Sequence, residues 1–479
     1  MRGALNFFSD LPESVSEWIL NNGVERHVME NTSILREGTR CDALFIVLEG
    51  LLSVSVSATR IATLGPGELL GDISFVENVT ASASVDALES SLLLEIPHAT
   101  VEEKIRKDCG FAAEFYRALA RLNAHRLRNS VSAFGSHWGQ NRTAGALKET
   151  WEKLEAGLEQ FKSFMVDADT EALKNDNIIS DDTINEGVAR FRDFCLLLNS
   201  LVGDSAPENP SVKAELGSRV RAEILPYLSL TQTAERFYSK PRGYAGDFFT
   251  IELIYQNQPA GVGRIGKLVD KCFLEHSTSK AVRNRRALLA GEILEVVKQN
   301  QPRASAVTSL ACGPAEELFD AFEDLDQRDR LKASCLDIDL QALAFVLEKR
   351  DKRRLQTRMQ LINANLVYLA LGKQKLDLAK QDLIYSIGLI DYFSDKLVIK
   401  LLNSIYGWLR LGGKIILGNF HPRNSSKALM DYVLDWKLIH RSEEDMNRLF
   451  EESAFRRPAT AIRFEEEGIN LFAECIRSS

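Results

Sequence analysis

The ten residues SLACGPAEEL (Ser309–Leu318) begin within the last part of an apolar run, SAVTSLAC, and end at the first residue of a helical pattern, LFDAFEDL. The apolar run predicts a buried strand and the pattern after it predicts a helix, so the stretch forms a strand–turn–helix unit. In a doubly wound sheet, ligands bind at such turns, at the carboxyl ends of the strands. The turn is therefore the first candidate for a binding loop.

Strands and helices alternate on both sides of this turn. The pattern predicts helices in RNRRALLAGEILEVVKQ, LQALAFVLEKRDKRR and SDKLVIKLLNSIYGWLRL, and strands in KASCLDID, DLIYSIGLI and GGKIILGNF. Such alternation indicates βαβ units and a parallel sheet. The tail, TAIRFEEEGINLFAECIR, predicts two strands joined by a short turn, an antiparallel hairpin at the edge of the sheet.

The composition of the turn narrows the choice of cofactor. A dinucleotide pyrophosphate contacts backbone amides directly and needs several glycines, but only Gly313 is present. S-adenosylmethionine has no phosphate, and its amino acid end and ribose can lie over a turn that needs one glycine. Gly313, flanked by the small residues Ala311 and Ala315, meets this looser demand.

A second candidate contact follows the next strand. A carboxylate that accepts both ribose hydroxyls is expected about 20 residues after the loop. Asp337, in CLDID, lies 24 positions after Gly313 and ends the apolar stretch. Asp339 begins the next helix and is expected to be its N-cap. Ala311, Gly313 and Asp337 therefore form the core of the predicted cofactor site.

Two further loops extend the candidate site. LINANLVYL places Asn363 and Asn365 after a third strand, where their amides either contact the adenine edge or only stabilise the turn. The fourth strand and the turn after it, in QDLIYSIGLIDYF, place five residues beside the cofactor's methyl group: Tyr385, Ser386, Gly388, Asp391 and Tyr392.

The N-terminal part of the chain has a different pattern. Residues 30–100 alternate apolar and small polar residues with regular glycine turns, which predicts an antiparallel barrel or jelly roll. A helix follows, with Phe111, Phe115, Leu119 and Leu122 on one stripe. Residues 140–202 predict further helices that serve as packing and spacer elements, and GDSAPENPS (203–211) predicts a linker.

Bulk properties exclude several classes of protein. The chain has 479 residues, which predicts two or three domains, and a net charge of −8, which disfavours nonspecific nucleic-acid binding. No apolar run approaches the length of a membrane span, and the N-terminus lacks a signal-peptide core. Seven scattered cysteines without CxxC spacing indicate reduced thiols, no zinc site and a cytoplasmic location.

The C-terminal half resembles a known family. Residues 282–476, with SLACGPAEEL, Asp337 and LRLGGKIIL, resemble class I S-adenosylmethionine-dependent methyltransferases. More narrowly, KPRGYAGDFFTIELIY, IYSIGLIDYFSD and GNFHP are similar to bacterial proteins that make 3-hydroxypalmitic acid methyl ester. The resemblance covers residues from about 230 onward. It implies a Rossmann-like seven-stranded sheet, S-adenosylmethionine as cofactor, and a small, fatty-acid-like acceptor.

The chemistry of the acceptor decides which residues are needed. A carboxylate acceptor needs no base, whereas a hydroxyl or amine acceptor must lose a proton. Asp391, Tyr392 and His421 follow the fourth and fifth strands; His421 is either a general base or a histidine on the pocket rim. KPRGYAGD contributes Arg242, Tyr244 and Asp247, which form a lid or a structural turn. Two more residues, Trp436 and Arg441, are candidates to close the pocket.

The N-terminal barrel resembles a cyclic nucleotide-binding domain. The similarity rests on ILREGTRCDALFIVLEGLLSV and LGPGELLGDISF, over roughly residues 10–130. That family holds the ribose with a Glu after a glycine and the cyclic phosphate with an Arg. Asp72 stands at the Glu position and Ala81 at the Arg position, with Arg40 and Arg60 nearby in sequence. Cyclic nucleotide binding is therefore doubtful, and the barrel is expected to regulate or dimerise.

These observations combine into one interpretation. We expect a cyclic nucleotide-binding-like domain (1–132), a helical region (133–230) and a methyltransferase domain with an N-terminal lid (231–479) in a homodimer. The expected activity is S-adenosylmethionine-dependent methylation of a small molecule, without nucleic acid, metal or a membrane span. A catalytically inactive protein that senses a ligand is the alternative. A DNA-binding regulator is disfavoured by the acidic charge and by the absence of an obvious helix-turn-helix after the barrel.

Overall fold

The chain folds as two compact units. The computed structural model describes residues 13–478 except 58, 66–67, 78, 135–143, 208–209 and 243. One unit contains residues 1–142 with the short segment 240–245, and the other contains residues 143–239 and 246–479. The second unit therefore consists of two stretches of the chain, and the six residues 240–245 separate them.

Two antiparallel four-stranded sheets build the first unit. The first has the order β1 (Val24–Val28), β8 (Ser91–Pro97), β3 (Ala43–Glu49), β6 (Leu69–Leu70). The second has the order β2 (Ser33–Leu35), β7 (Ser84–Ala87), β4 (Leu52–Val56), β5 (Thr59–Leu64). Val47, Leu52 and Leu93 are fully buried in a core that both sheets share. The predicted antiparallel β-fold is confirmed.

Four helices accompany these sheets: α2 (Glu13–Asn22), α3 (Asp72–Glu77), α4 (His98–Lys107) and α5 (Cys109–Phe134). On α5, the Phe111 ring lies 4.8 Å from Trp18, and the Phe115 ring lies 5.9 Å from Phe75. Phe111, Phe115 and Leu119 are therefore buried within their own unit. Pairing of this stripe with a second copy of the chain stays a prediction, and the side chain of Leu122, its fourth member, lies outside the described residues.

Helices also form the first part of the second unit: α6 (Ala144–Lys174), α7 (Asp181–Val202), α8 (Pro210–Leu228), α9 (Thr233–Ser239), α10 (Phe248–Gln256), α11 (Gly266–Leu274) and α12 (Ser277–Gln299). The Phe161 ring of α6 lies 5.7 Å from both Phe191 and Tyr227, which joins the first three helices. The predicted linker, 203–211, lies between the end of α7 at Val202 and the first turn of α8, and its residues 208–209 lie outside the described part of the chain. Pro210 is the first residue of α8, a position where its missing N–H costs nothing.

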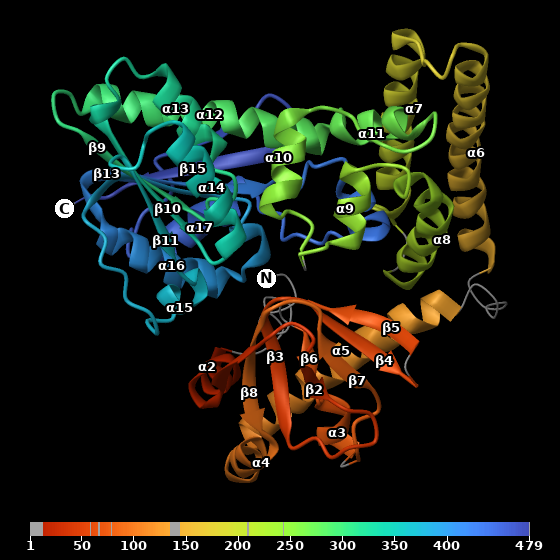
Figure 1. Ribbon diagram of the computed structural model, residues 1–479, viewed down its shortest axis with the longest axis horizontal. Helices are drawn as coiled ribbons and strands as arrows, with labels where there is room; N and C mark the ends of the chain where they lie inside the picture. The colour runs from red at the N-terminus through yellow and green to blue at the C-terminus, as the bar shows by residue number, and fades with distance from the viewer. Residues whose placement is uncertain are drawn as a thin grey trace. The chain divides into compact units, whose positions relative to one another are not determined.

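A seven-stranded sheet follows, and Figure 1 shows it with its helices. Its order is β11 (Met359–Asn363), β10 (Leu331–Asp337), β9 (Ser305–Leu310), β12 (Gln381–Ile387), β13 (Leu409–Phe420), β15 (Asn470–Ile476), β14 (Ala461–Phe464). The first five strands are parallel, and β15 and β14 form the antiparallel edge hairpin. The predicted sheet and terminal hairpin are confirmed.

The helices between these strands are α13 (Glu316–Asp324), α14 (Leu340–Lys352), α15 (Leu366–Ala370), α16 (Asp395–Trp408) and α17 (Glu443–Glu452). Apolar residues of α12, α13 and α14 share one core cluster with β9, β10 and β12, in which Phe319 and Phe322 are buried. The helix predicted through Leu411 ends at Trp408, because Leu409 already pairs with Gln381 of β12. The rigid sheet fixes where each strand ends, and those ends carry the candidate site.

Candidate functional site

Three neighbouring strand ends form the centre of the candidate site. β9 lies between β10 and β12, and all three strands are parallel, so their carboxyl ends meet at one edge of the sheet. Gly313 follows β9, Asp337 ends β10, and Gly388 follows β12. This is the edge at which doubly wound sheets bind ligands.

The loop after β9 has an unusual backbone. Ala311, Gly313 and Ala315 have φ values of 53°, 52° and 53°, in the left-handed region that non-glycine residues rarely adopt. The loop is held by the Cys312 amide, which donates to the Leu336 carbonyl at 3.0 Å. A Cβ at Gly313 would meet no atom within 4 Å. The backbone here is thus strained and open on one side, as expected where a ligand approaches it.

Asp337 links the first two strand ends. Its side chain is buried; one oxygen accepts from the Gly313 amide at 3.0 Å and the other from the Asp339 amide at 2.9 Å. Burial raises the pKa of Asp337 to about 6, although these hydrogen bonds oppose the shift. An ionised carboxylate has about four acceptor positions. The amides of Gly313 and Asp339 take two of them and the Ile338 amide lies close to the carboxylate, so an acceptor position remains for a ribose hydroxyl.

The two asparagines after β11 have local partners. The Asn363 amide nitrogen donates to the carbonyls of Asp337 (3.2 Å) and Ile338 (2.8 Å). Asn365 is the N-cap of α15, and its side-chain oxygen accepts from two backbone amides of the first turn. The Asn363 side chain thus stabilises backbone next to Asp337, the Asn365 side chain stabilises the start of α15, and contact of either with an adenine stays a prediction.

The side chains of β12 point into the fold. Tyr385 is buried and donates to Glu317 at 2.8 Å, and Ser386 donates to the Leu310 carbonyl at 3.1 Å. Both residues join β12 to β9 and α13. Only their backbone belongs to the strand-end edge, so a direct contact of either side chain with a cofactor stays a prediction.

Asp391 and Tyr392 lie on the 3-10 turn Ile390–Tyr392, directly after β12. Asp391 is buried, accepts from the Phe420 amide at 2.7 Å, and has its pKa raised to about 6 by burial. The Tyr392 hydroxyl accepts from the Trp436 indole at 2.9 Å. Asp391 thus connects the turn after β12 to the end of β13, and Tyr392 connects the same turn to Trp436.

His421 has little freedom to act as a base. Its Nδ1 accepts from the Arg423 amide at 3.1 Å, and its Nε2 lies 2.8 Å from a Glu443 oxygen. Because Nδ1 accepts, the proton lies on Nε2 and is donated to Glu443. No lone pair on the ring is left for an acceptor's proton, and the geometry favours the structural alternative for this residue.

Two other predicted residues hold the fold together. Asp247 is fully buried, caps α10 by accepting from Thr250, and pairs with Arg236 at 2.9 Å. Arg441 is buried and donates to the carbonyls of Ile390 and Phe393, which anchors the turn after β12. Both residues thus have structural partners, and a contact of Asp247 with the cofactor and one of Arg441 with the pocket stay predictions.

Arg242 and Tyr244 lie in segment 240–245, which groups with the first unit. Their role as a lid stays a prediction.

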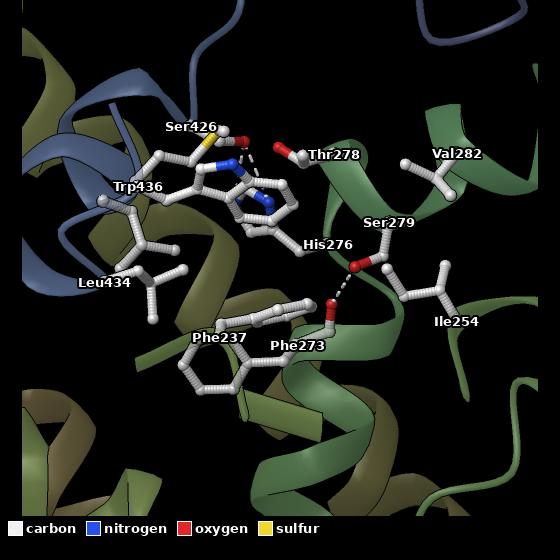
Figure 2. A pocket seen from close by; sticks show the side chains of 12 residues that line it. Phe237, Ile254, Phe273, His276, Thr278, Ser279, Val282, Ser426, Leu434 and Trp436 are labelled. Atoms are coloured by element: carbon white, nitrogen blue, oxygen red, sulfur yellow. Dashed lines mark hydrogen bonds between the residues drawn. The ribbon is translucent and has the colours of Figure 1, made fainter. Parts of the chain in front are cut away.

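A small cavity lies behind Trp436 (Figure 2). It has a volume of about 20 Å³, room for one water molecule, and its wall is mainly apolar. Four of its polar lining residues are His276, Thr278, Ser279 and Ser426. The sequence gives no sign of it, since it gathers short segments of α9, α10, α12 and the loop after β13.

The polar side of the cavity is built around His276. Its Nδ1 lies 2.9 Å from the Ser426 hydroxyl, and burial lowers its pKa to about 4, so the ring is neutral. The buried hydroxyl of Thr278 has no hydrogen-bond partner among the described residues. The cavity therefore offers one neutral polar group in an apolar wall, which fits an uncharged ligand group or a water molecule.

In the first unit, the two diagnostic positions are both buried. Asp72 begins α3, and Ala81 is held by its backbone, whose amide donates to Thr39 at 2.8 Å. Arg40 is exposed and paired with Asp42 at 2.5 Å. A methyl group thus stands where the related family has its phosphate-binding cation, and the nearby Arg40 already has a carboxylate partner.

Comparison with known families assigns both units. Residues 25–108 match the family described as "Cyclic nucleotide-binding domain", and residues 243–470 match the family described as "Putative methyltransferase". The first unit is therefore similar to cyclic nucleotide-binding domains and the second to a methyltransferase family, in agreement with the two resemblances of the sequence. No curated protein matches the chain.

Three solved structures illustrate the similarity of parts of the chain to known proteins. A "possible exported protein" from Bordetella parapertussis is 17% identical, with 63% of this chain and 97% of that chain covered and a TM-score of 0.42. The catabolite activator protein of Thermus thermophilus is 23% identical, with coverages of 33% and 71% and a TM-score of 0.24. A cyclic nucleotide-binding domain from Methylobacillus flagellatus is 16% identical, with coverages of 29% and 88% and a TM-score of 0.25.

Within the described part of the chain, no helix combines the length and apolar character needed to cross a membrane.

Proposed function

We propose that the second unit is an S-adenosylmethionine-dependent methyltransferase that acts on a small-molecule acceptor. One observation carries the proposal: the buried Asp337 carboxylate is tied to the Gly313 amide at the adjoining ends of β10 and β9. The carboxylate keeps an acceptor position for a ribose hydroxyl, and the loop has one glycine and an open face. The family match of residues 243–470 supports the same reaction class.

The residues at this edge have distinct proposed tasks. Asp337 holds the ribose, and the loop around Gly313 lies under the amino acid end of the cofactor, whose sulfonium supplies the methyl group. Methyl transfer is an in-line displacement, so the positions of the two reactants determine much of the rate. Asp391 is the proposed proton acceptor for a hydroxyl or amine substrate, because its pKa of about 6 suits that role near neutral pH.

Calorimetry tests the cofactor assignment. The full chain is expected to bind S-adenosylhomocysteine with an affinity in the micromolar range. Asp337→Ala should weaken binding by about 1.5–3 kcal/mol, because it removes a charged hydrogen-bond acceptor. Glu323→Ala, on the exposed end of α13, is a matched control that removes one carboxylate elsewhere. Equal affinities of the wild type and Asp337→Ala would reject the role of Asp337.

The first unit has a proposed regulatory or dimerising role. Its buried Ala81, in place of a cation, supports weak cyclic nucleotide binding. We also propose a cytoplasmic location, which the seven free cysteines support. We propose a homodimer as well, on the sequence alone.

A protein that binds the cofactor without catalysis is the second candidate. The hydrogen bonds that occupy both nitrogens of His421 favour it. Separate measurements distinguish the two: methyl transfer to small molecules that co-purify with the protein supports the enzyme. Tight cofactor binding without transfer to any of them supports the sensor.

A further inference from the structure

A buried arginine that the sequence did not single out lies at the same edge of the sheet. Arg285, on α12, has only 7% of its surface exposed. Its guanidinium packs over Gly388: a Cβ at that glycine would lie 3.3 Å from Nη1. Gly388 has a φ of 77° and follows β12. The guanidinium is thus held at the turn where the fourth strand ends.

Arg285 has the Tyr255 hydroxyl as a hydrogen-bond partner but no carboxylate bonded to it among the described residues. No hydrogen bond or ion pair joins it to a carboxylate in the described part of the chain, whereas its neighbour Arg286 pairs with Asp320 at 2.6 Å. Glu317 and Asp391 are close enough to interact with Arg285 electrostatically, and the Tyr255 hydroxyl is next to it.

Glu317 and Asp391 are already bonded to other groups. Glu317 accepts from Tyr385, and Asp391 accepts from the Phe420 amide. A buried guanidinium has five donors and is stable when an anion satisfies them. The arrangement therefore calls for an anionic group of a ligand.

The order of the strands indicates which anion this is. From Asp337 on β10 to Gly388 after β12, the edge crosses two inter-strand spacings, about 10 Å. A cofactor whose ribose is held at Asp337 passes over the Gly313 loop and brings the end of its amino acid chain toward Gly388. That end carries a carboxylate, the planar group that an arginine binds through two parallel hydrogen bonds.

We propose that Arg285 binds the carboxylate of the cofactor's amino acid portion, an inference that rests on the proposed function of the second unit. The acceptor is another source of a carboxylate at this turn. The two sources are separable, because a cofactor fragment without the amino acid chain cannot use Arg285.

Affinities for S-adenosylhomocysteine and for 5′-methylthioadenosine, which lacks the amino acid carboxylate, test the proposal in the full chain. Arg285→Gln should lower affinity for S-adenosylhomocysteine by about 30-fold or more and change that for methylthioadenosine by less than about threefold. Arg285→Lys keeps the charge but loses the paired donors, so its affinity for S-adenosylhomocysteine should lie between those of the wild type and Arg285→Gln. Lys280→Gln removes a more exposed charge from the same helix and should change neither affinity.

The outcomes separate the two proposals. If the wild type binds neither compound, the proposed function fails before Arg285 is tested. If Arg285→Gln weakens both compounds equally, or neither, the carboxylate assignment is wrong; an unchanged cofactor affinity with lost acceptor binding assigns Arg285 to the acceptor. If Arg285→Gln does not fold, the wild-type protein tests the proposal with a changed ligand. It should bind the carboxamide analogue of S-adenosylhomocysteine at least tenfold more weakly than S-adenosylhomocysteine itself, and equal affinities would reject the proposal.

Discussion

Asp337 shows how one side chain organises the candidate site. Its two oxygens accept from backbone amides on either side of the edge, at Gly313 and Asp339, so the carboxylate is fixed before any ligand arrives. Those bonds favour the ionised form, whereas burial disfavours it more strongly and sets the pKa at about 6. The negative charge of Asp337, which ribose binding requires, is therefore lost when the pH falls below about 6.

Cofactor affinity is expected to fall as the pH drops through 6. The pKa of Asp337 is raised from 3.8 to about 6, so the side chain is ionised above pH 7 and protonated below pH 5. A protonated carboxyl group accepts fewer hydrogen bonds, and affinity for S-adenosylhomocysteine should decrease by up to about tenfold per pH unit below 6. Calorimetry between pH 5 and 8 measures this.

Two variants identify the titrating group. Asp337→Asn should bind weakly and with no pH dependence in this range. Asp391 also has a pKa of about 6, so Asp391→Asn is the matched control and should keep the wild-type dependence. A flat profile in Asp391→Asn would transfer the effect to Asp391.

Tyr392 and Asp391 are expected to matter for methyl transfer rather than for cofactor binding. Asp391→Asn removes the proposed proton acceptor and should lower the rate with a hydroxyl or amine acceptor by about 100-fold or more, with cofactor affinity nearly unchanged. Single-turnover assays with the identified acceptor measure this. A carboxylate acceptor, which needs no base, would show a much smaller loss.

At the scale of elements, the sequence predicted the sheet and the position of its loops well. Alternating patterns locate all seven strands, and the spacing of Gly313 and Asp337 places both on adjoining strand ends, as the structure shows. The partners of polar side chains were not predictable. The sequence suggested ligand contacts for Asn365 and Asp247, which stay predictions, but it did not show that both side chains cap helices, because capping depends on local backbone that a sequence pattern does not specify.

Arg285 is a residue that the sequence analysis missed, although the structure places it at the candidate site. Its helix, RNRRALLAGEILEVVKQ, contains three arginines within four positions, and nothing in their order shows which one is buried. That depends on the rotation of α12 against the end of β12, a tertiary property. Gly388 is the part of this contact that a sequence can suggest, since a glycine directly after a strand often marks a close approach.

Gly388→Ala is expected to disturb both stability and cofactor binding. At φ 77° an alanine costs about 1 kcal/mol of folding free energy, and its Cβ would press on the Arg285 guanidinium at 3.3 Å. Gly412→Ala is the matched control, because it has φ 78° and no atom within 4 Å of its Cβ. Denaturant unfolding should show a loss in both variants, and calorimetry should show weaker S-adenosylhomocysteine binding only in Gly388→Ala. Equal affinities of Gly388→Ala and Gly412→Ala for S-adenosylhomocysteine would contradict a role of the Gly388–Arg285 contact in binding.

At the scale of the whole molecule, the chain combines a region that matches the cyclic nucleotide-binding domain family with a region that matches a methyltransferase family. The first domain keeps the sheets and the short helix α3 of its family resemblance but carries Ala81 where a cation is expected. A fold can persist when its original ligand contact is lost, since the core of the two sheets does not depend on that residue. Its ligand and its effect on the second unit are therefore open to direct tests.

The first unit is expected to ignore physiological cyclic AMP and cyclic GMP and to recover binding when the missing cation is restored. Loss of the charge-assisted contact to a buried phosphate costs about 2–5 kcal/mol, which turns a micromolar site into a millimolar one. Ala81→Arg should raise the affinity by about 30-fold or more. Ser82→Arg adds the same charge at an exposed neighbouring position and should not. Calorimetry on the full chain gives both affinities, and methyl-transfer assays with bound nucleotide then show whether this unit regulates the other. A saturable response of the wild type at micromolar nucleotide would mean that another group, such as Arg60, neutralises the phosphate.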